Sequence, residues 1–441
     1  MATDLTRISE KARKEPDLVF TSLYHHIYDV DNLRACYDAL EAGKATGVDG
    51  VSKKEYGENL EENLRDLSAR LRRMGYRPGP KRRSYIPKAG SSKGRPLGIS
   101  NLEDKIVEQS AKRTLEPIYE PVFCDSSYGY RPLRNQHQCL ETLGRTIQQR
   151  KVSHLVEADI RSFFNKVNHE WVVKFLRHRI GDERVIRLII RMLKSGIMED
   201  GLVRATEEGT PQGSMISPLL SNIYLHYALD LWFSRRVSRQ SRGEAYYFRF
   251  ADDFLACFQY KRDAVDFQRR LDDRLEGFGL ELAKEKTDCI EFGRYARETA
   301  YKRGEKPKEF TFLGFTHYCG KTKRGHFKVK RRTSRKKLGQ SLRNFTDWSK
   351  KARNVLKKGE MLRQARMRVM GHLSYYAITD NSERCRFYVY RTKHILFKWL
   401  NRKSQRKAYT WERFDQALNW VKWPRPTIRR DLNPCRRAEA Y

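Results

Sequence analysis

The chain of 441 residues is long enough for two or three domains, and with 39% hydrophobic residues it can bury a substantial core. Its formal charge of +36 at pH 7 favours a polyanionic partner, for which nucleic acid is the first candidate and a merely basic soluble surface the alternative. No stretch approaches 18 apolar residues, which excludes a membrane-spanning helix, and the eight cysteines include no Cys-x-x-Cys pair, which argues against a zinc knuckle and a disulfide framework.

The charge is distributed unevenly along the chain. Residues 321–441 contain 35 Lys and Arg against 8 Asp and Glu, a net charge of +27, whereas residues 1–320 contain 55 against 46, a net charge of +9. This division predicts a catalytic body that needs carboxylates, followed by a basic module that binds nucleic acid. The first 16 residues have no apolar signal core and the scattered cysteines suit a reducing compartment, so we expect a cytoplasmic protein.

The N-terminal part is predicted to be helical around one hairpin. Leucines recur at helical spacing between residues 60 and 71, which predicts an amphipathic helix. Residues 76–98 are rich in Pro, Gly, Lys and Arg around a short apolar run, which predicts a β-hairpin with a basic tip. Residues 101–120 again carry apolar side chains on one helical face.

The middle of the chain alternates between strand and helix patterns. Strands are predicted at 154–160, at 246–258 as two short strands around a tight turn, and at 287–292. Helices are predicted at 168–198, 219–238 and 261–278. This order of elements predicts an α+β fold with an antiparallel sheet.

From residue 332 onward the pattern predicts three basic helices that form a separate bundle. Their apolar faces are expected at Leu338, Leu342 and Phe345, at residues 362–376, and at Phe387, Tyr390, His394 and Phe397. We therefore expect a body at 1–320, a helical module at 321–410 and a short basic extension at 411–441.

Asp252 and Asp253 lie between two aromatic runs that favour strands. A two-residue turn would place both carboxylates at the tip of a hairpin. Acidic residues are also common in ordinary turns, which is the simpler explanation of the pair taken alone. The chain contains its own comparison, since Asp272 and Asp273 lie on a charged helical face and receive no role.

Asp159 follows an apolar strand and precedes an aromatic pair and a helix. Its simpler explanation is a solvated or helix-capping acid. A carboxylate at a strand end can instead join the hairpin acids, and three such acids suit nucleotide transfer. In that reaction two Mg²⁺ ions stabilise the attacking and leaving oxygens, and Mg²⁺ prefers carboxylate oxygen. Positioning and charge neutralisation then supply most of the catalysis.

Two further segments carry residues that suit a triphosphate. Pro211 and Gly213 shape a tight loop in which Gln212 offers an amide, although an ordinary turn before a helix is the simpler reading. In the basic hairpin, Lys88 and Arg95 would grip a triphosphate, and a generic phosphate-binding surface is the alternative.

Taken together and in this order, the motifs resemble the reverse-transcriptase series of group II intron proteins. The likeness runs from about residue 40 to the C-terminus, and TPQG…SPLLSN followed by ADD is its most specific part. The matching blocks are SYGYRP (127–132), DIRSFFNKVNH (159–169), TPQGSMISPLLSNIYL (210–225), RFADDF (249–254), GLELAKEKT (279–287) and FTFLGF (310–315).

The resemblance implies a right-hand polymerase with fingers, palm and a helical thumb, and it implies roles for individual residues. The catalytic and metal-binding carboxylates would be Asp159, Asp252 and Asp253, with the backbone of Ile160 as a further ligand of two Mg²⁺ ions, for which Mn²⁺ would substitute. Lys88, Arg95, Phe164 and Gln212 would contact the incoming dNTP, and Arg249, Phe250 and Lys286 the primer or template.

Phe164 would exclude a 2′-hydroxyl by its bulk and so favour dNTPs over NTPs. The alternative for Phe163 and Phe164 is core packing, and strand alternation predicts that one of the two is core. Phe250 is a departure, because the family usually has Tyr before Ala-Asp-Asp. The ring is kept and a hydroxyl is lost, so we expect activity to survive with a changed primer contact or fidelity.

The implied partners are an RNA template, a DNA primer or target, dNTPs and an intron RNA bound by the thumb, with no membrane and an open oligomeric state. The implied activity is RNA-directed DNA synthesis together with maturase assistance to intron splicing and mobility. Exposed aromatics such as Trp348, Tyr375 or Trp399 would stack on bases, although core packing is the more frequent use of such residues.

Three rival functions stay open. An RNA-directed RNA polymerase usually has Gly-Asp-Asp and a polar 2′-hydroxyl reader, so Ala251 and Phe164 argue against it. An RNA-binding splicing factor without polymerase activity is opposed by the intact acids. A host-adopted reverse transcriptase in defence or repair is excluded by nothing in the chain.

Overall fold

The protein is described from a computed structural model that defines residues 5–86, 94–199, 201–204, 208–210, 212–402 and 409–432. The described part contains three sheets among many helices, and the expected α+β fold is confirmed. The chain forms two compact units. The first comprises residues 1–135, 156–256 and 262–289, and the second comprises 136–155, 257–261 and 290–441. The module boundaries expected at 320 and 410 stay a prediction.

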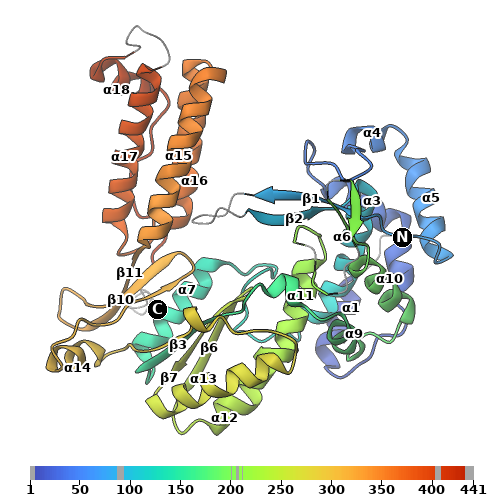
Figure 1. Cartoon of the computed structure of the whole chain (residues 1–441), viewed down its shortest axis with the longest axis horizontal. Coiled ribbons are helices and arrows are strands. Elements are labelled where there is room, and N and C mark those ends of the chain that lie inside the picture. The colour runs from blue at the N-terminus through green and yellow to red at the C-terminus, as the bar shows by residue number, and fades with distance from the viewer. Residues whose placement is uncertain are drawn as a thin grey trace. The chain divides into compact units, whose positions relative to one another are not determined.

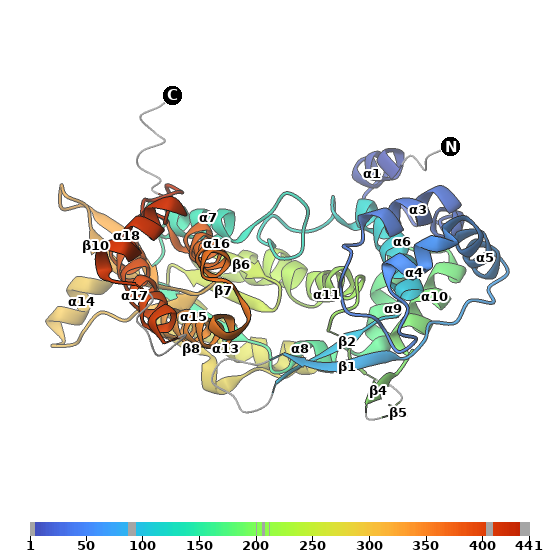
Figure 2. The same cartoon turned by 90° about the horizontal axis from the view of Figure 1, so that it is seen from above.

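The first unit begins with helices around a small sheet (Figure 1). The helices are α1 (Leu5–Lys14), α2 (Tyr24–Tyr28), α3 (Val30–Ala39), α4 (Lys53–Glu58), α5 (Leu60–Arg72) and α6 (Leu102–Tyr119). The strands are β1 (Lys81–Ile86), β2 (Arg95–Ile99), β4 (Ile197–Glu199) and β5 (Leu202–Arg204), in the order β2-β1-β4-β5. β1 and β2 pair antiparallel, as expected for the hairpin, and β1 and β4 pair parallel (Figure 2). Lys88 lies outside the described residues.

The long helical run expected at 168–198 is two helices, α9 (His169–Arg177) and α10 (Glu183–Leu193). Asp182 explains the break. Its Oδ1 accepts from the Arg184 backbone N–H at 3.1 Å and so caps α10, while its Oδ2 accepts from the backbone N–H groups of Leu23 and Tyr24 at 2.9 Å. A side chain that caps a helix start competes with helix continuation, and apolar periodicity does not report this competition.

A second sheet has the order β6-β7-β3-β8. Its strands are β3 (His154–Asp159), β6 (Ala245–Phe250), β7 (Asp253–Phe258) and β8 (Asp288–Glu291), and the division between the two units runs through β3, β7 and β8. The helical segments near it in sequence are α8 (Phe163–Lys166), α11 (Ser217–Leu225), the π-helices η1 (His226–Asp230) and η2 (Phe233–Val237), α12 (Ser238–Gln240), α13 (Lys261–Glu276) and the 3-10 turn η3 (Lys284–Lys286).

The remainder of the second unit combines a three-stranded sheet with a helical bundle. The elements are α7 (Gln136–Gln149), α14 (Ala296–Lys302), β9 (Phe310–Phe312), β10 (Phe315–Lys321) and β11 (Phe327–Thr333), then α15 (Arg335–Val355), α16 (Lys358–Tyr376), α17 (Ser382–Asn401) and α18 (Trp411–Trp420). The sheet order is β11-β10-β9 with antiparallel pairing. Figures 1 and 2 both show α15, α16 and α17 side by side, and Phe414 and Leu418 of α18 join their buried core.

The expected apolar faces of the first two bundle helices are confirmed in outline, since Leu338, Phe345 and Leu373 are buried. The face expected for the third helix is wrong, because Phe387 and Tyr390 are 44% and 58% exposed. The buried positions of α17 are Cys385, Tyr388, Thr392, Leu396, Trp399 and Leu400. Aromatic residues occur on both faces of this basic helix, so their spacing alone does not identify the core side.

Among the described helices, none combines the length and the apolar character that crossing a bilayer requires.

Candidate active site

The hairpin of β6 and β7 carries two of the three predicted acids at its turn. Ala251 and Asp252 form the two-residue turn, and Asp253 is the first residue of β7. Ala251 has φ 58°, a left-handed conformation that a tight hairpin turn requires at its first position and that a non-glycine residue adopts at a cost. The turn therefore has the predicted form, with a strained residue directly before the two carboxylates.

Asp159 lies at the same edge of the sheet. The backbone N–H of Ser153 donates to the carbonyl of Phe258 at 2.9 Å, which joins the start of β3 to the end of β7. The two neighbouring strands therefore run antiparallel, and the end of β3 lies beside the start of β7. We call Asp159, Asp252 and Asp253 the carboxylate edge.

The backbone of Ile160 is oriented toward the β7 side of β3. Ile160 forms an isolated antiparallel bridge with Leu282. The two hydrogen bonds of this bridge are made by the residues that flank Ile160 and Leu282 in sequence, not by Ile160 and Leu282 themselves. The backbone N–H of Arg161 donates to the Glu281 carbonyl at 2.8 Å, and the backbone N–H of Ala283 donates to the Asp159 carbonyl at 2.9 Å. In such a non-hydrogen-bonded pair the N–H and C=O of the residue itself point away from the partner. The Ile160 carbonyl is therefore available on the side from which β7 approaches.

Lys286 forms an ion pair with the carboxylate edge. Its ammonium group donates a hydrogen bond to Asp159 Oδ2. This hydrogen bond and the negative charge of Asp159 raise the pKa of Lys286, with smaller contributions from the charges of Glu285 and Asp253. The ammonium thus balances part of the negative charge where the three acids gather. The role expected for Lys286 at the primer or template stays a prediction.

The donor set of the edge fits a hard divalent cation. Among the described residues, no three His, Cys, Asp or Glu side chains already surround one metal position. Mg²⁺ usually takes one or two protein carboxylates and completes its shell with water and substrate phosphates. The residues that would hold it are the three aspartates and the carbonyl of Ile160.

The predicted aromatic pair follows the edge on a short helix. Phe163 is 2% exposed and packs edge-to-face on Phe164, which is only half-buried. The expectation that one ring is core is confirmed, but the reason was wrong, because both residues lie on α8 rather than on a strand. The backbone N–H of Thr210 donates to the Phe164 carbonyl at 2.7 Å, so the loop before Gln212 lies against this helix.

Gln212 lies in a loop that is fixed by its backbone. The Gly98 N–H of β2 donates to the Gln212 carbonyl at 2.7 Å, and a Cβ on Gly213, which has φ 110°, would lie 2.8 Å from the Gly98 carbonyl oxygen. On the other side, Met215 N–H donates to Glu108 Oε2 at 2.8 Å, and Glu108 forms a fully buried ion pair with Lys81. Gln212 thus lies beside β2, the strand that begins with Arg95.

Arg249 does not fit its predicted contact with primer or template. Its side chain is fully buried and pairs with Asp230, with Nη2 2.6 Å from Oδ2. Burial alone lowers the pKa of this guanidinium, but the Asp230 carboxylate more than offsets that effect, so the group stays charged. A side chain without exposed surface cannot grip nucleic acid, and the prediction for Arg249 is corrected. Phe250 is half-buried, and its role at the primer stays a prediction.

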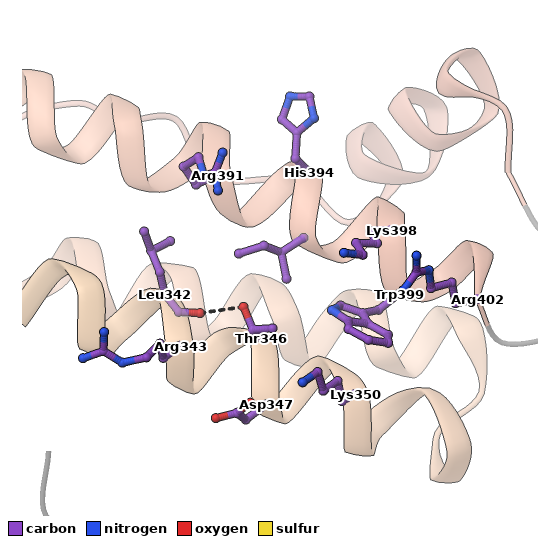
Figure 3. A pocket seen from close by; sticks show the side chains of 11 residues that line it. Leu342, Arg343, Thr346, Asp347, Lys350, Arg391, His394, Lys398, Trp399 and Arg402 are labelled. Carbon is purple, nitrogen blue, oxygen red and sulfur yellow. Dashed lines mark hydrogen bonds between the residues drawn. The ribbon is translucent and has the colours of Figure 1, made fainter. Parts of the chain in front are cut away.

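A groove of about 730 Å³ lies between α15 and α17 (Figure 3). Its lining includes five cations and one acid, and we call it the cationic groove. The charged lining residues are Arg343, Lys350, Arg391, Lys398, Arg402 and Asp347. Such an excess of positive side chains around one concave surface attracts a polyanion.

Trp399, predicted as a possible base-stacking residue, is 9% exposed and belongs to the bundle core. Cationic groups of Lys350, Arg353, Lys398 and Arg402 lie 4.8–5.7 Å from its ring centroid. Its ring therefore partly stabilises the cluster of positive charges by cation–π attraction. Trp348 and Tyr375 are partly buried, so their role in stacking stays a prediction.

Sequence reasoning missed the buried polar groups behind the site, namely Glu108, Asn222 and Asp230. Each is less than 3% exposed and lies within a segment predicted to be helical. The available signal was a polar residue on an apolar helical face, since such a residue must find a buried partner.

Comparison with known proteins agrees with this geometry. A family model described as reverse transcriptase (RNA-dependent DNA polymerase) matches residues 86–317, which is more than half of the chain. The chain is 37% identical over 222 residues, 50% of its length, to the group II intron-encoded protein LtrA of Lactococcus lactis subsp. cremoris, and the match covers 37% of that protein. It is 39% identical over 204 residues, 46% of its length, to protein YkfC of Escherichia coli (strain K12), of which 53% is covered.

A plant protein, nuclear intron maturase 1 (mitochondrial) of Arabidopsis thaliana, is 31% identical over 112 residues, 24% of this chain and 15% of the relative. The matches thus span about half or less of these relatives.

Proposed function

We propose that this chain, which belongs to the reverse transcriptase family, extends a DNA primer on an RNA template with dNTPs. The observation that carries the proposal is the carboxylate edge. Asp159 ends β3 and Asp253 begins the adjacent antiparallel β7, so three acids gather at one edge of the sheet. The three acids lie within residues 86–317, the segment that matches the reverse transcriptase family model.

Two Mg²⁺ ions, or Mn²⁺ in their place, would be held by the three aspartates and the Ile160 carbonyl and would supply the positive charge that phosphoryl transfer requires. The residues of the chain do the positioning. Phe164, whose side chain is half-buried, would exclude a 2′-hydroxyl of the incoming nucleotide by its bulk. Gln212 contacts the bound nucleotide, and Lys88 and Arg95 bind the triphosphate.

Lys286 has a second part in this proposal. Its ammonium occupies Asp159 Oδ2 when no ion neutralises that carboxylate. Asp159 would also be a ligand of the metal, and Lys286, whose side chain is 61% exposed, would then contact the primer or template. The chain thus keeps its acids partly neutralised before substrate arrives.

We further propose that the helical bundle binds RNA, including intron RNA, and that the protein assists group II intron splicing and mobility. The cationic groove supports this, because its lining, which comes from two helices, contains five cationic side chains and only one acidic side chain. Similarity to an intron-encoded protein and to an intron maturase points in the same direction. The groove also favours the second candidate, an RNA-binding splicing factor without polymerase action, since its charge does not depend on the carboxylate edge.

The test is dNTP incorporation on poly(rA)/oligo(dT) with Mg²⁺, with rNTPs as a parallel substrate. The key variant combines Asp252→Ala with Asp253→Ala. The matched control combines Asp272→Ala with Asp273→Ala, an adjacent acidic pair on α13 that lies outside the carboxylate edge. RNA affinity is measured for all three proteins by filter binding.

We expect incorporation by the wild-type protein and the control, and none by the key variant, while all three bind RNA equally. Equal incorporation by the key variant and the wild-type protein would overturn the proposed site. Tight RNA binding without any incorporation by the wild-type protein would reject the polymerase proposal and favour the splicing factor.

A further inference from the structure

Arg249 and Asp230 form a buried pair behind the turn that carries Asp252. The Arg249 Nε and Nη2 atoms donate to the two carboxylate oxygens of Asp230 at 2.8 and 2.6 Å. Both side chains are fully buried. A bidentate pair fixes the orientation of the guanidinium as well as its charge.

The remaining guanidinium nitrogen reaches the turn itself. Arg249 Nη1 donates to the Ala251 carbonyl and to Asn222 Oδ1, both at 3.0 Å. The Ala251 carbonyl belongs to the peptide that joins Ala251 to Asp252, so the hydrogen bond fixes the peptide plane from which Asp252 begins. Because Ala251 is held at φ 58°, an unfavourable conformation, the turn needs such support from its surroundings.

A neighbouring segment holds the turn from a second side. Asn222 Nδ2 donates to the Gly129 carbonyl at 2.7 Å. A Cβ on Gly129 would lie only 2.3 Å from the backbone nitrogen of Ala251, so the two backbones are in direct contact. Asn222 therefore connects Arg249 to Gly129, and its amide serves both with one oxygen and one nitrogen.

We propose that Asp230, Asn222 and Arg249 are positioning residues that fix the Ala251–Asp252 peptide and thereby set the affinity of the carboxylate edge for a divalent metal. The proposal rests on the proposed function for its catalytic readout only. Groups that orient metal-binding residues from behind typically change metal affinity or activity by about 10- to 100-fold when they are removed.

A purely structural role is the competing explanation, and it predicts different measurements. Buried ion pairs can often be replaced by apolar residues without loss of stability, so stability alone gives no reason for this pair. If the three residues only stabilise the fold, their loss lowers the unfolding midpoint and leaves the metal affinity of the folded protein unchanged.

Two variants separate the parts of the network. Asn222→Asp keeps an oxygen for Arg249 but loses the N–H donor to Gly129, without a change of size. Arg249→Lys keeps a positive charge for Asp230 but cannot also reach Asn222 and the Ala251 carbonyl. Leu275→Ala, which removes a fully buried side chain of α13, is the control for lost stability.

The full chain without nucleic acid is titrated with Mn²⁺ and binding is followed by electron paramagnetic resonance. Thermal unfolding and the Mg²⁺ concentration for half-maximal incorporation are measured on the same proteins. We expect both network variants to bind Mn²⁺ about 10- to 100-fold more weakly than the wild-type protein and to need correspondingly more Mg²⁺. We expect Leu275→Ala to lower the unfolding midpoint and to bind Mn²⁺ as the wild-type protein does.

Wild-type Mn²⁺ affinity in Asn222→Asp overturns the proposal, whatever its unfolding midpoint, and so does a wild-type protein that binds no Mn²⁺. If Arg249→Lys fails to fold, Asn222→Asp alone decides. Weakened Mn²⁺ binding in the variants of a protein that incorporates no dNTP would support the positioning residues and reject the proposed polymerase function.

Discussion

The carboxylate edge and the cationic groove carry opposite charges, and they hold those charges in different ways. Each acid of the edge has a short side chain at a strand end or a turn, and buried hydrogen bonds fix the backbone behind the turn. The cations of the groove are long lysine and arginine side chains on two helices. The difference suits two tasks, because metal-assisted chemistry requires fixed atoms, whereas binding a flexible phosphate backbone tolerates mobile charges.

The largest expected effect comes from removing one acid of the edge. Asp159→Asn should lower dNTP incorporation by about 1000-fold, since metal ions at such sites supply several kcal/mol of transition-state stabilisation. Asp288→Asn, at the exposed start of β8 on the same sheet edge, should retain activity. Steady-state incorporation assays measure both, and equal losses in the two variants would show that the edge acts only through its overall charge.

The second effect concerns the groove. A triple variant, Arg343→Ala, Lys350→Ala and Arg391→Ala, should weaken RNA binding by on the order of 100-fold at about 0.1 M salt and make it less salt-dependent, because each lost phosphate contact removes counterion release. Lys351, Lys357 and Lys358 are exposed on the same bundle outside the groove lining, and their triple alanine variant is the control. If both variants lose RNA binding equally, net charge and not the groove determines affinity.

The third effect is a pH dependence in the first unit. Burial raises the pKa of Asp104 to about 6, and Tyr76 and Gly79 donate hydrogen bonds to it. The Asp104 carboxyl therefore binds its proton more tightly in the folded state than in the unfolded chain. The stability that protonated Asp104 contributes is lost as the pH rises from about 4 to 6. Compared with Asp104→Asn, the wild-type protein should lose up to about 3 kcal/mol of unfolding free energy across this window. Urea unfolding at several pH values tests this, and parallel profiles would contradict it.

The fourth effect distinguishes two neighbouring rings. Phe164→Ala should lower the preference for dNTPs over NTPs by about 10- to 100-fold, the range that loss of steric discrimination in an apolar pocket typically covers. Phe163→Ala should instead cost about 3–5 kcal/mol of stability, because this ring is buried. Competitive incorporation and urea unfolding provide the two readouts. An unchanged nucleotide preference in Phe164→Ala would assign that ring to packing.

The smallest effect concerns Lys286. Lys286→Met removes the ammonium that competes for Asp159, so half-maximal incorporation should require a few-fold less Mg²⁺. Maximal incorporation should fall, because the released ammonium is proposed to contact primer or template. Lys284→Met, which removes an exposed partner of Asp272, should leave the Mg²⁺ requirement unchanged. A higher Mg²⁺ requirement in Lys286→Met would show that the lysine supports metal binding instead of competing with it.

Local signals in the sequence were sufficient for much of the fold. The hairpins at 76–98 and 246–258, the strand that ends at Asp159 and the helix α6 were predicted from alternation, turn residues and apolar spacing. Periodicity did not reveal the cap at Asp182 or the buried side of α17, because a cap depends on one side chain and aromatic residues occur on both faces of that helix.

The location of a site residue in the fold was predictable where the neighbouring sequence determines it, as at the end of a strand or in a tight turn. Arg249 was not, because a basic residue beside the acids suggests contact with nucleic acid unless its partner is known. That partner, Asp230, lies 19 residues earlier in a π-helix, and no local pattern connects the two. Long-range pairs of buried polar residues are the part of a site that a single sequence does not encode visibly.

The contact of residues 126–128 with β6 also protects the molecule from association. β6 is the outermost strand of its sheet, and its sequence AYYFRF is rich in aromatic residues that favour strands. Ser126 and Tyr128 pair with the backbone N–H and carbonyl of Arg249, so near its C-terminal end the outer side of β6 offers no open backbone groups at Arg249 to another chain. Loosening that segment would expose a template for intermolecular strand pairing, and the same short stretch that supports the site would then determine how readily the protein aggregates.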